Sequence, residues 1–409
     1  MNPSMNIAKR IVFAPAFGNT SKSIEGTYLN KGTLSRIYRI ATSVFFFVAG
    51  LTFATWASRI PDIQNKLHLS DAGLGGVLLA LPVGLMAGLP LSGWLVGRFG
   101  SRQLVVAGAL LYPLTLILLA IAGSTLQLSI GLFLFGLFGN LINIAMNTQA
   151  VGVETLYGKS IMASFHGLWS IAGFSGALIG TFFVSAGLSP LIHFSIVCGM
   201  AVLLVLISYK YTMPHDNAGS KSQALFVKPD KRILILGLIA FCCMLCEGAM
   251  ADWSGVYFKK VVQAPDSYTT LGYLAFTSTM ALGRFVGDWL VTKFGIKKML
   301  QMSGIIITAG LLIAVIFPYL LTAAIGFFLV GFGVSSVIPI VFGSAGRSTT
   351  MSPSTALATV STIGFLGFLI GPPVIGFIAQ AINLRWSFTL IAILGFGTTL
   401  LAAKVKNDN

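Results

Sequence analysis

The sequence predicts an all-α membrane protein with twelve transmembrane helices in two six-helix halves. Three observations predict this fold class: 56% of the 409 residues are hydrophobic, only 9% are charged, and the apolar residues fall in long uninterrupted runs. A soluble domain carries about 25% charged residues, so a soluble enzyme is excluded. One membrane-spanning helix needs about 20 apolar residues, so a chain of this length holds at most about a dozen spans.

Each apolar run is bounded by charged residues or by Gly/Pro turns, and each is long enough for one crossing. A single long polar stretch, 210–231, divides the runs into six and six. We expect tails at 1–36 and 404–409, and halves at 37–209 and 232–403 joined by 210–231. In order, the expected spans are 37–57, 72–96, 103–122, 126–150, 161–186, 190–209, 232–257, 268–291, 298–317, 320–342, 354–380 and 385–403.

The loops between these spans predict the orientation, because positive residues are retained on the cytoplasmic face. With the N-terminus inside, the outer loops hold only Arg59, Lys66, Lys259, Lys260 and Arg385. The inner side holds both tails and Arg98, Arg102, Lys159, Lys210, Lys221, Lys228, Lys231, Arg232, Lys293, Lys297, Lys298 and Arg347. We therefore expect a multi-pass protein of the cell inner membrane with both termini in the cytoplasm.

The chain has 26 Lys and Arg against 11 Asp and Glu, a formal net charge of +15. In a soluble protein this balance would suggest nucleic acid, but these basic residues sit in short loops between spans. We therefore expect the lipid bilayer as the partner and no nucleic acid. The four cysteines lie inside apolar runs and indicate neither a disulfide framework nor a metal site. We expect no cofactor and a monomer.

Three segments of the first half recur in the second half. The offset is 195 residues for the first two pairs and 197 for the third. Two halves of six spans each enter the membrane from the same side, as parallel repeats related by an axis along the membrane normal do. Rocking of one half against the other around a central site indicates a carrier. The paired segments are Trp94–Arg102 with Trp289–Lys297, Gly131–Gly136 with Gly326–Gly331, and Ala54–Trp56 with Ala251–Trp253.

The loop after the second expected span reads Gly93-Trp94-Leu95-Val96-Gly97-Arg98-Phe99-Gly100-Ser101-Arg102. It resembles the signature loop of the major facilitator superfamily, G-x-L-x-D-R-x-G-R-R, and the resemblance extends to the span count, the central loop and the repeat. Within the superfamily, Trp56–Pro61, Glu247–Trp253 and Gly371–Pro373 resemble the fucose-permease-like branch, which includes uncharacterised bacterial YbjJ-type proteins. The resemblance implies the major facilitator fold and alternating-access transport, and the branch implies a sugar-like solute.

The signature loop departs from the family pattern at one position. The family's loop Asp is replaced by Gly97 in the first repeat and by Thr292 in the second. Arg284 and Asp288, spaced i,i+4 at the inner end of the eighth expected span, are candidates for a substitute pair. We expect gating roles for these two residues and for the loop residues Arg98, Arg102 and Lys293, with topology anchoring as the alternative for the basic loop residues.

Ionisable residues inside a span are costly and mark candidate functional sites. Glu247 lies about 22 Å into the seventh expected span, at 1.5 Å per residue, and is the leading candidate for the coupling proton. The alternative is a structural carboxyl group that is hydrogen-bonded to another helix. Asp252 lies nearer the outer mouth, where pairing with Arg59 and gating is one interpretation and ligand binding another.

Polar and aromatic residues in the fourth and fifth spans predict a substrate-binding cavity. Asn140, Asn143 and Asn147 recur at i, i+3 and i+7 on one helical face, where they need interior partners because lipid offers none. Helix-to-helix hydrogen bonding is the alternative. His166 and Trp169 add a donor and an aromatic platform, and His166 is also a candidate proton relay. Trp56, Trp253 and Tyr257 are placed in the outer aromatic belt.

These features predict a secondary transporter that moves a small polar solute, a sugar or related metabolite, by proton symport. The predicted binding residues are Asn140, Asn143, Asn147, His166, Trp169 and Glu247. No sequence motif for catalysis or for ATP binding occurs. Two alternatives stay open: a proton-coupled exporter of drugs or metabolites, and a membrane receptor that does not transport.

Overall fold

A computed structural model describes residues 31–158, 161–214, 230–348 and 351–405, and all regular elements in this part of the chain are helical. Residues 1–30 of the expected N-terminal tail lie outside the described residues. Helix α1 begins at Lys31, within the last part of the expected tail. The first half comprises α1 (Lys31–Ala57), α2 (Ile60–Lys66), α3 (Asp71–Leu78), α4 (Ala80–Phe99), α5 (Ser101–Ile121), α6 (Thr125–Tyr157), α7 (Met162–Ser185), α8 (Pro190–Ser208) and the short 3-10 helix η1 (Tyr209–Tyr211).

The second half follows the same plan. It comprises α9 (Lys231–Lys260), the 3-10 helix η2 (Asp266–Tyr268), α10 (Leu271–Phe294), α11 (Ile296–Ile316), α12 (Leu320–Ser335), α13 (Val337–Gly346), α14 (Pro353–Ala381) and α15 (Leu384–Ala403). If α3–α4 and α12–α13 each count as one broken span, the described part of the chain has twelve spans, as the sequence predicts. Eleven of these segments are long and apolar enough to cross a membrane; α10, which carries Arg284 and Asp288, is the twelfth.

Proline explains the two broken spans, which the sequence reading had taken as continuous. Proline lacks the N–H that would donate to the carbonyl four residues earlier, and its ring clashes with that carbonyl. Pro82 therefore disrupts the helix at Leu78, where α3 ends, and Pro339 disrupts it at Ser335, where α12 ends. Helix α2 is a further element that was not predicted, and Pro61 in its first turn is favourable there.

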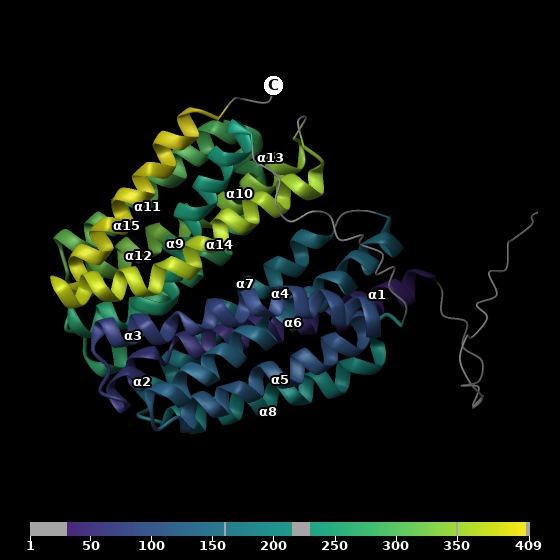
Figure 1. Cartoon of the computed structure of the whole chain (residues 1–409), viewed down its shortest axis with the longest axis horizontal. Coiled ribbons are helices and arrows are strands. Elements are labelled where there is room, and N and C mark those ends of the chain that lie inside the picture. Colours follow the sequence, from purple (N-terminus) through teal and green to yellow (C-terminus); the bar gives the residue numbers. More distant parts are fainter. Residues whose placement is uncertain (1–30, 159–160, 215–229, 349–350, 406–409) are drawn as a thin grey trace, which may run out of the picture.

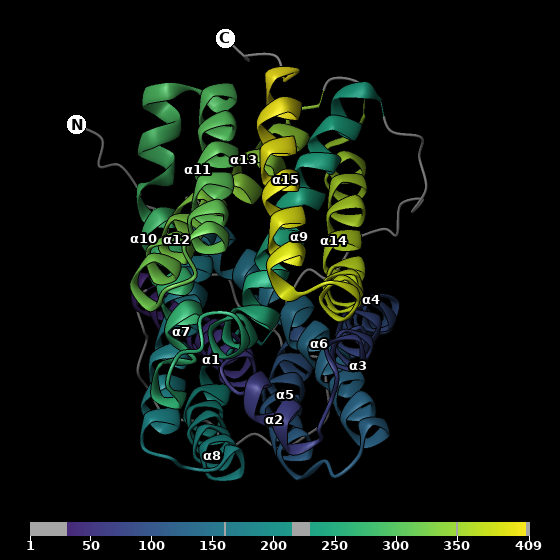
Figure 2. The same ribbon diagram turned by 90° about the vertical axis from the view of Figure 1, so that its left-hand side faces the viewer.

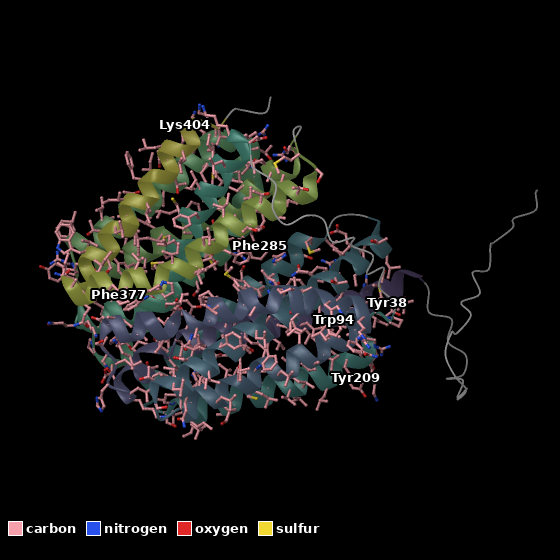
Figure 3. All side chains as sticks on the ribbon, viewed as in Figure 1. Tyr38, Trp94, Tyr209, Phe285, Phe377 and Lys404 are labelled. Atoms are coloured by element: carbon pink, nitrogen blue, oxygen red, sulfur yellow. The ribbon has the colours of Figure 1, made fainter. Side chains whose placement is uncertain are left out.

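The two halves form two groups of helices that lie one above the other (Figures 1 and 2). The groups meet at the end of the molecule that carries α2 and α3, and they diverge toward the end where α1 begins and α13 lies (Figure 1). We call these the closed end and the open end. Phe285 of α10 lies at the seam between the groups (Figure 3). The ribbon therefore has the shape of a V, with its apex at the closed end.

The repeat seen in the sequence is also a repeat of backbone and contacts. Gly100 and Gly295, each between two spans, have φ/ψ of 84°/153° and 78°/158°, a conformation that only glycine adopts readily. Arg98 lies over the rings of Trp94 and Phe99, and Lys293 lies in the same way over Trp289 and Phe294. The two inter-span turns are therefore built alike, 195 residues apart.

The outer surface of the bundle is apolar, as a lipid-facing surface must be. Large apolar side chains are exposed along the peripheral helices, for example Leu203 (59%) and Leu206 (55%) on α8 and Leu321 (71%) on α12. In water, exposed apolar patches of this extent are rare. In lipid they cost nothing, and the helices satisfy their backbone groups internally. The chain is a multi-pass membrane protein.

Three aromatic residues lie elsewhere than predicted. Trp56, Trp253 and Tyr257 are only 0–1% exposed, so their placement in an outer aromatic belt is wrong. The Tyr257 hydroxyl donates to the carbonyl of Ala314 at 2.9 Å. Trp56 packs on Phe135, with ring centroids 6.4 Å apart. Tyr257 and Trp56 thus pack helices of the same half together, which is a structural role.

Candidate functional site

A contact between the two halves lies at mid-depth and is centred on Arg284. Its Nη1 donates to Ser170 Oγ of α7 at 2.7 Å, and its guanidinium carbon lies 5.6 Å from the ring centroid of Trp169. Arg284 is ten residues, or about 15 Å at 1.5 Å per residue, from the end of α10. Helix α10 continues to Phe294, three residues beyond the expected end of the span, and the Arg284 side chain crosses the seam to α7.

Glu247 lies near this contact, on α9. It is sixteen residues, or about 24 Å, from the start of its helix, and so deep in the bundle. Its carboxyl group is half-buried and makes no hydrogen bond or ion pair with any residue that the structure describes. Arg284 is close enough to act on Glu247 electrostatically, and it acts on His166 in the same way. The structural alternative for Glu247, a carboxyl group bonded to another helix, therefore has no described partner.

Of the two fifth-span residues, Trp169 is half-buried and His166 is exposed. The His166 ring meets the edge of Phe46, with centroids 5.3 Å apart. The structure thus brings together His166, Trp169 and Ser170 of the first half with Arg284 and Glu247 of the second. A donor-rich, aromatic and ionisable surface of this kind can bind a polar solute.

The three asparagines of α6 do not act as one wall. Asn140 is 1% exposed, packs at Gly88 of α4, and leaves its Oδ1 without a partner among the described residues. Asn143 and Asn147 are half-buried, and Asn147 Nδ2 donates to Asn143 Oδ1 at 2.7 Å. Asn140 therefore packs between helices, but no described hydrogen bond of its side chain supports the alternative of helix-to-helix hydrogen bonding. Asn143 and Asn147 stay candidates for solute binding.

At the closed end, backbone contacts and an ion pair hold the halves together. Lys260 of α9 lies 2.5 Å from the carboxylate of Asp71 in α3, which also accepts from Gln64 Nε2 at 3.1 Å. Gly75 of α3 packs against the backbone of α14 at Gly376. Thr270 donates to Thr181 at 2.8 Å, linking α10 and α7. A solute cannot pass this end while these contacts hold.

Arg59 does not pair with Asp252, so that expectation is wrong for this structure. The Arg59 guanidinium donates to Asp62 at 2.6 Å, to the carbonyl of Leu188 at 2.9 Å and to His193 Nδ1 at 3.2 Å. These contacts join α2 to α8 within the first half. Asp252 is half-buried and makes no hydrogen bond or ion pair with a described residue. Its gating role stays a prediction.

Sequence reasoning assigned nothing to His193. In the structure it is fully buried, stacks on Phe183 with centroids 4.7 Å apart, and accepts from Arg59. The two residues are 134 positions apart, and no local pattern could have linked them. Ser170 was also missed, because a serine in an apolar run carries no signal of its own.

Comparison with known proteins now decides the family. The family model of the Major Facilitator Superfamily matches residues 41–354 and 275–408. The chain belongs to the major facilitator superfamily. An uncharacterized MFS-type transporter of Yersinia pestis is 36% identical over 361 residues, which cover 87% of this chain and 92% of that protein. As a member of this superfamily, the chain is a membrane transporter.

Two solved structures of superfamily transporters share the fold. A bacterial homologue of the human lysosomal transporter Spinster, inward-facing and occupied, has a TM-score of 0.73 at 15% identity, covering 90% of this chain and 97% of that one. The Escherichia coli fucose:proton symporter has a TM-score of 0.59 at 18% identity, covering 90% and 98%. These likenesses concern the fold alone.

The superfamily's signature loop can now be located in the structure. Arg98 and Lys293 are exposed and rest on aromatic rings of their own loops, while Arg102 is half-buried. None of the three contacts the opposite half among the described residues. The side chain of Asp288 lies outside the described residues, so its predicted pair with Arg284 stays a prediction. The gating roles of the loop residues stay predictions as well.

Proposed function

We propose that this protein is a secondary active transporter that moves a small polar solute, a sugar or related metabolite, by alternating access and proton symport. The observation that carries the proposal is the mid-depth contact of Arg284 with Ser170 and Trp169 across the seam, beside the unpaired carboxyl group of Glu247. The closed and open ends support alternating access, because they expose such a site from one side at a time. The fucose-permease-like branch is part of this proposal.

Glu247 is the group we assign to the coupling proton. An ionised carboxylate deep in a membrane protein costs several kcal/mol unless it is paired, and no described residue pairs with it. Protonation removes that cost, so proton binding and the movement of α9 against the first half are energetically linked. His166 is the assigned relay, because it is exposed near the same arginine.

The character of the site favours this proposal over drug export. The cavity beside Arg284 has a volume of about 170 Å³ and contains two arginines and two serines, whereas pockets for drug-sized ligands are lined predominantly by hydrophobic and aromatic side chains. This lining supports a small polar solute. With the termini in the cytoplasm, as the basic loops indicate, the open end faces inward and the solute is released there.

The test is accumulation of solutes by sealed proteoliposomes under an imposed pH gradient. A panel of sugars, sugar acids and nucleosides is assayed with the wild type, with Glu247→Gln and with Asp266→Asn, whose carboxylate is 85% exposed near Lys259. We expect Glu247→Gln to abolish pH-driven accumulation while retaining exchange, and Asp266→Asn to match the wild type. Wild-type accumulation by Glu247→Gln would refute the coupling role, and binding without flux in the wild type would indicate a receptor.

A further inference from the structure

A cavity in the second half contains two arginines. It is bounded by α10, α11, α12 and α13 and has a volume of about 170 Å³. Arg284 lies at mid-depth, and Arg347, which caps the end of α13, lies toward the open end. Ser335 and Ser336 line the same cavity. The described lining residues are Arg284, Gly287, Val291, Ile296, Ser335, Ser336, Pro339, Ile340, Gly343 and Arg347.

Neither guanidinium is neutralised by a described residue. Arg284 uses one nitrogen for Ser170 and its face for Trp169, and its Nε is buried without a hydrogen-bond partner. Arg347 is exposed to the cavity and makes no hydrogen bond or ion pair with a described residue. Glu247 acts on Arg284 electrostatically, but no ion pair within 4.0 Å joins them among the described residues. Among the described residues, no acidic side chain therefore lies within ion-pairing distance of either guanidinium.

Topology anchoring does not account for Arg284. Basic anchors lie at the ends of spans, as Arg98 and Lys293 do at the two equivalent turns of the repeat. Arg284 lies ten residues inside its helix, and its counterpart 195 residues earlier is Leu89. A membrane-interior arginine is costly and faces a partner or a polar cavity. The repeat therefore does not account for this charge, and its position beside the cavity favours a ligand.

The chemistry of the cavity fits a carboxylate. A guanidinium group presents parallel N–H donors that match the two oxygens of a carboxylate, and such charge-assisted bonds are about twice as strong as neutral ones. Serine hydroxyls can donate to or accept from hydroxyl groups of the same solute. None of the described lining residues is acidic, so none would repel an anion.

We propose that the transported solute carries a carboxylate, which Arg284 binds at mid-depth and Arg347 attracts from the open end. This inference rests on the proposed transport function and names its substrate class: a small organic acid or sugar acid rather than a neutral sugar. A single cavity with two guanidinium groups also accommodates a dicarboxylate.

The experiment compares three matched pairs of acid and alcohol on the purified full-length protein: D-glucuronate with D-glucose, D-gluconate with D-glucitol, and succinate with 1,4-butanediol. Equilibrium binding is measured by calorimetry for the wild type, for Arg284→Gln and for Arg347→Gln. Arg36→Gln is the matched control, because this arginine is exposed near the start of α1 and is assigned no role in binding or gating. We expect the acid of at least one pair to bind the wild type at least tenfold more tightly than its alcohol.

Arg284→Gln should lose at least tenfold in affinity for that acid, Arg347→Gln should lose severalfold, and Arg36→Gln should match the wild type. Thermal unfolding verifies that each variant is folded. If Arg284→Gln does not fold, Arg347→Gln alone tests the proposal. If in every pair the alcohol binds as tightly as the acid, or if neither arginine variant weakens acid binding, the inference is overturned.

Flux into proteoliposomes separates this inference from the proposed function. If the acid binds through Arg284 and does not enter vesicles, the carboxylate site stands and the transport function fails. If a neutral sugar is accumulated and no acid is, transport stands and the carboxylate inference fails.

Discussion

The contact between Gly75 and Gly376 should control which end of the transporter is open. A Cβ on Gly75 would lie 2.6 Å from the carbonyl oxygen of Pro372 and 3.0 Å from Cα of Gly376, and a Cβ on Gly376 would lie 2.5 Å from the carbonyl oxygen of Asp71. Non-bonded carbon atoms pack best at about 3.5–4.0 Å, so alanine must separate α3 from α14 by about 1 Å. Gly75→Ala therefore penalises only states in which this end is closed.

The expected magnitude follows from the size of the clash. Overpacking by a methyl group costs about 1–3 kcal/mol, and a bias of 1–3 kcal/mol changes the ratio of two states by about 5- to 150-fold. Gly76 on the same helix has no atom within 4 Å of an added Cβ. Gly76→Ala is therefore the matched control, because it changes the helix propensity of α3 equally and meets nothing.

The assay is a distance measurement between spin labels on cysteines introduced at Asn65 of α2 and Gln380 of α14, both exposed at the closed end. The four native cysteines are buried in their helices, so the labels should attach at the introduced sites. Gly75→Ala should increase the long-distance population, while Gly76→Ala should not. Identical distributions for the two folded variants would refute the idea that this glycine contact sets the equilibrium.

Two further predictions follow from the site. Arg59→Ala removes the donors to Asp62, Leu188 and His193, and a hydrogen bond to a charged group contributes about 1.5–3 kcal/mol. The melting temperature of Arg59→Ala should therefore fall well below that of Arg98→Ala. Equal melting temperatures of the two variants would contradict a stabilising role of the Arg59 network. Asn147→Ala should weaken binding of the tightest acid in the panel by about 1 kcal/mol, or roughly fivefold, whereas Asn140→Ala should leave the affinity for this acid unchanged. An unchanged affinity in Asn147→Ala would show that the cavity wall lies elsewhere.

The apolar runs and the internal repeat predicted the fold because both can be read directly from the order of residues along the chain. Gly100 and Gly295 mark two equal turns, and the six spans of each half follow from the lengths of the apolar runs. Pro82 and Pro339 were visible as well, but Pro90 and Pro113 lie inside continuous helices, so proline alone did not predict which spans are broken. The ends of spans were harder to predict where charged residues lie in the helix, as in α10, which was expected to end at residue 291 and ends at Phe294.

Contacts across the seam could not be predicted in this way. Arg284 meets Ser170 over 114 residues of sequence separation, and Arg59 meets His193 over 134. A single sequence does not show which faces of two helices pack against each other. Pairing partners were therefore inferred from the expected depth of each residue in the membrane. Arg59 was paired with Asp252 for this reason, although Asp62, three residues away on the next turn, reaches it first.

The site lies where the two repeats differ, and the packing explains why they can differ there. Gly50, the counterpart of Glu247, presses against the backbone carbonyl of Trp169, so that α1 and α7 pack closely only because position 50 has no side chain. In the second half, the close approach to backbone is made from the partner helix: Gly367 of α14 would place a Cβ 2.5 Å from the carbonyl of Phe241 in α9, whereas Gly248 of α9 faces the side chain of Phe368. Because α14 supplies the close approach, α9 is free to carry a carboxyl group at position 247. The symmetric framework thus tolerates an ionisable group in one half only, and a solute held between the halves meets a different chemistry on each side.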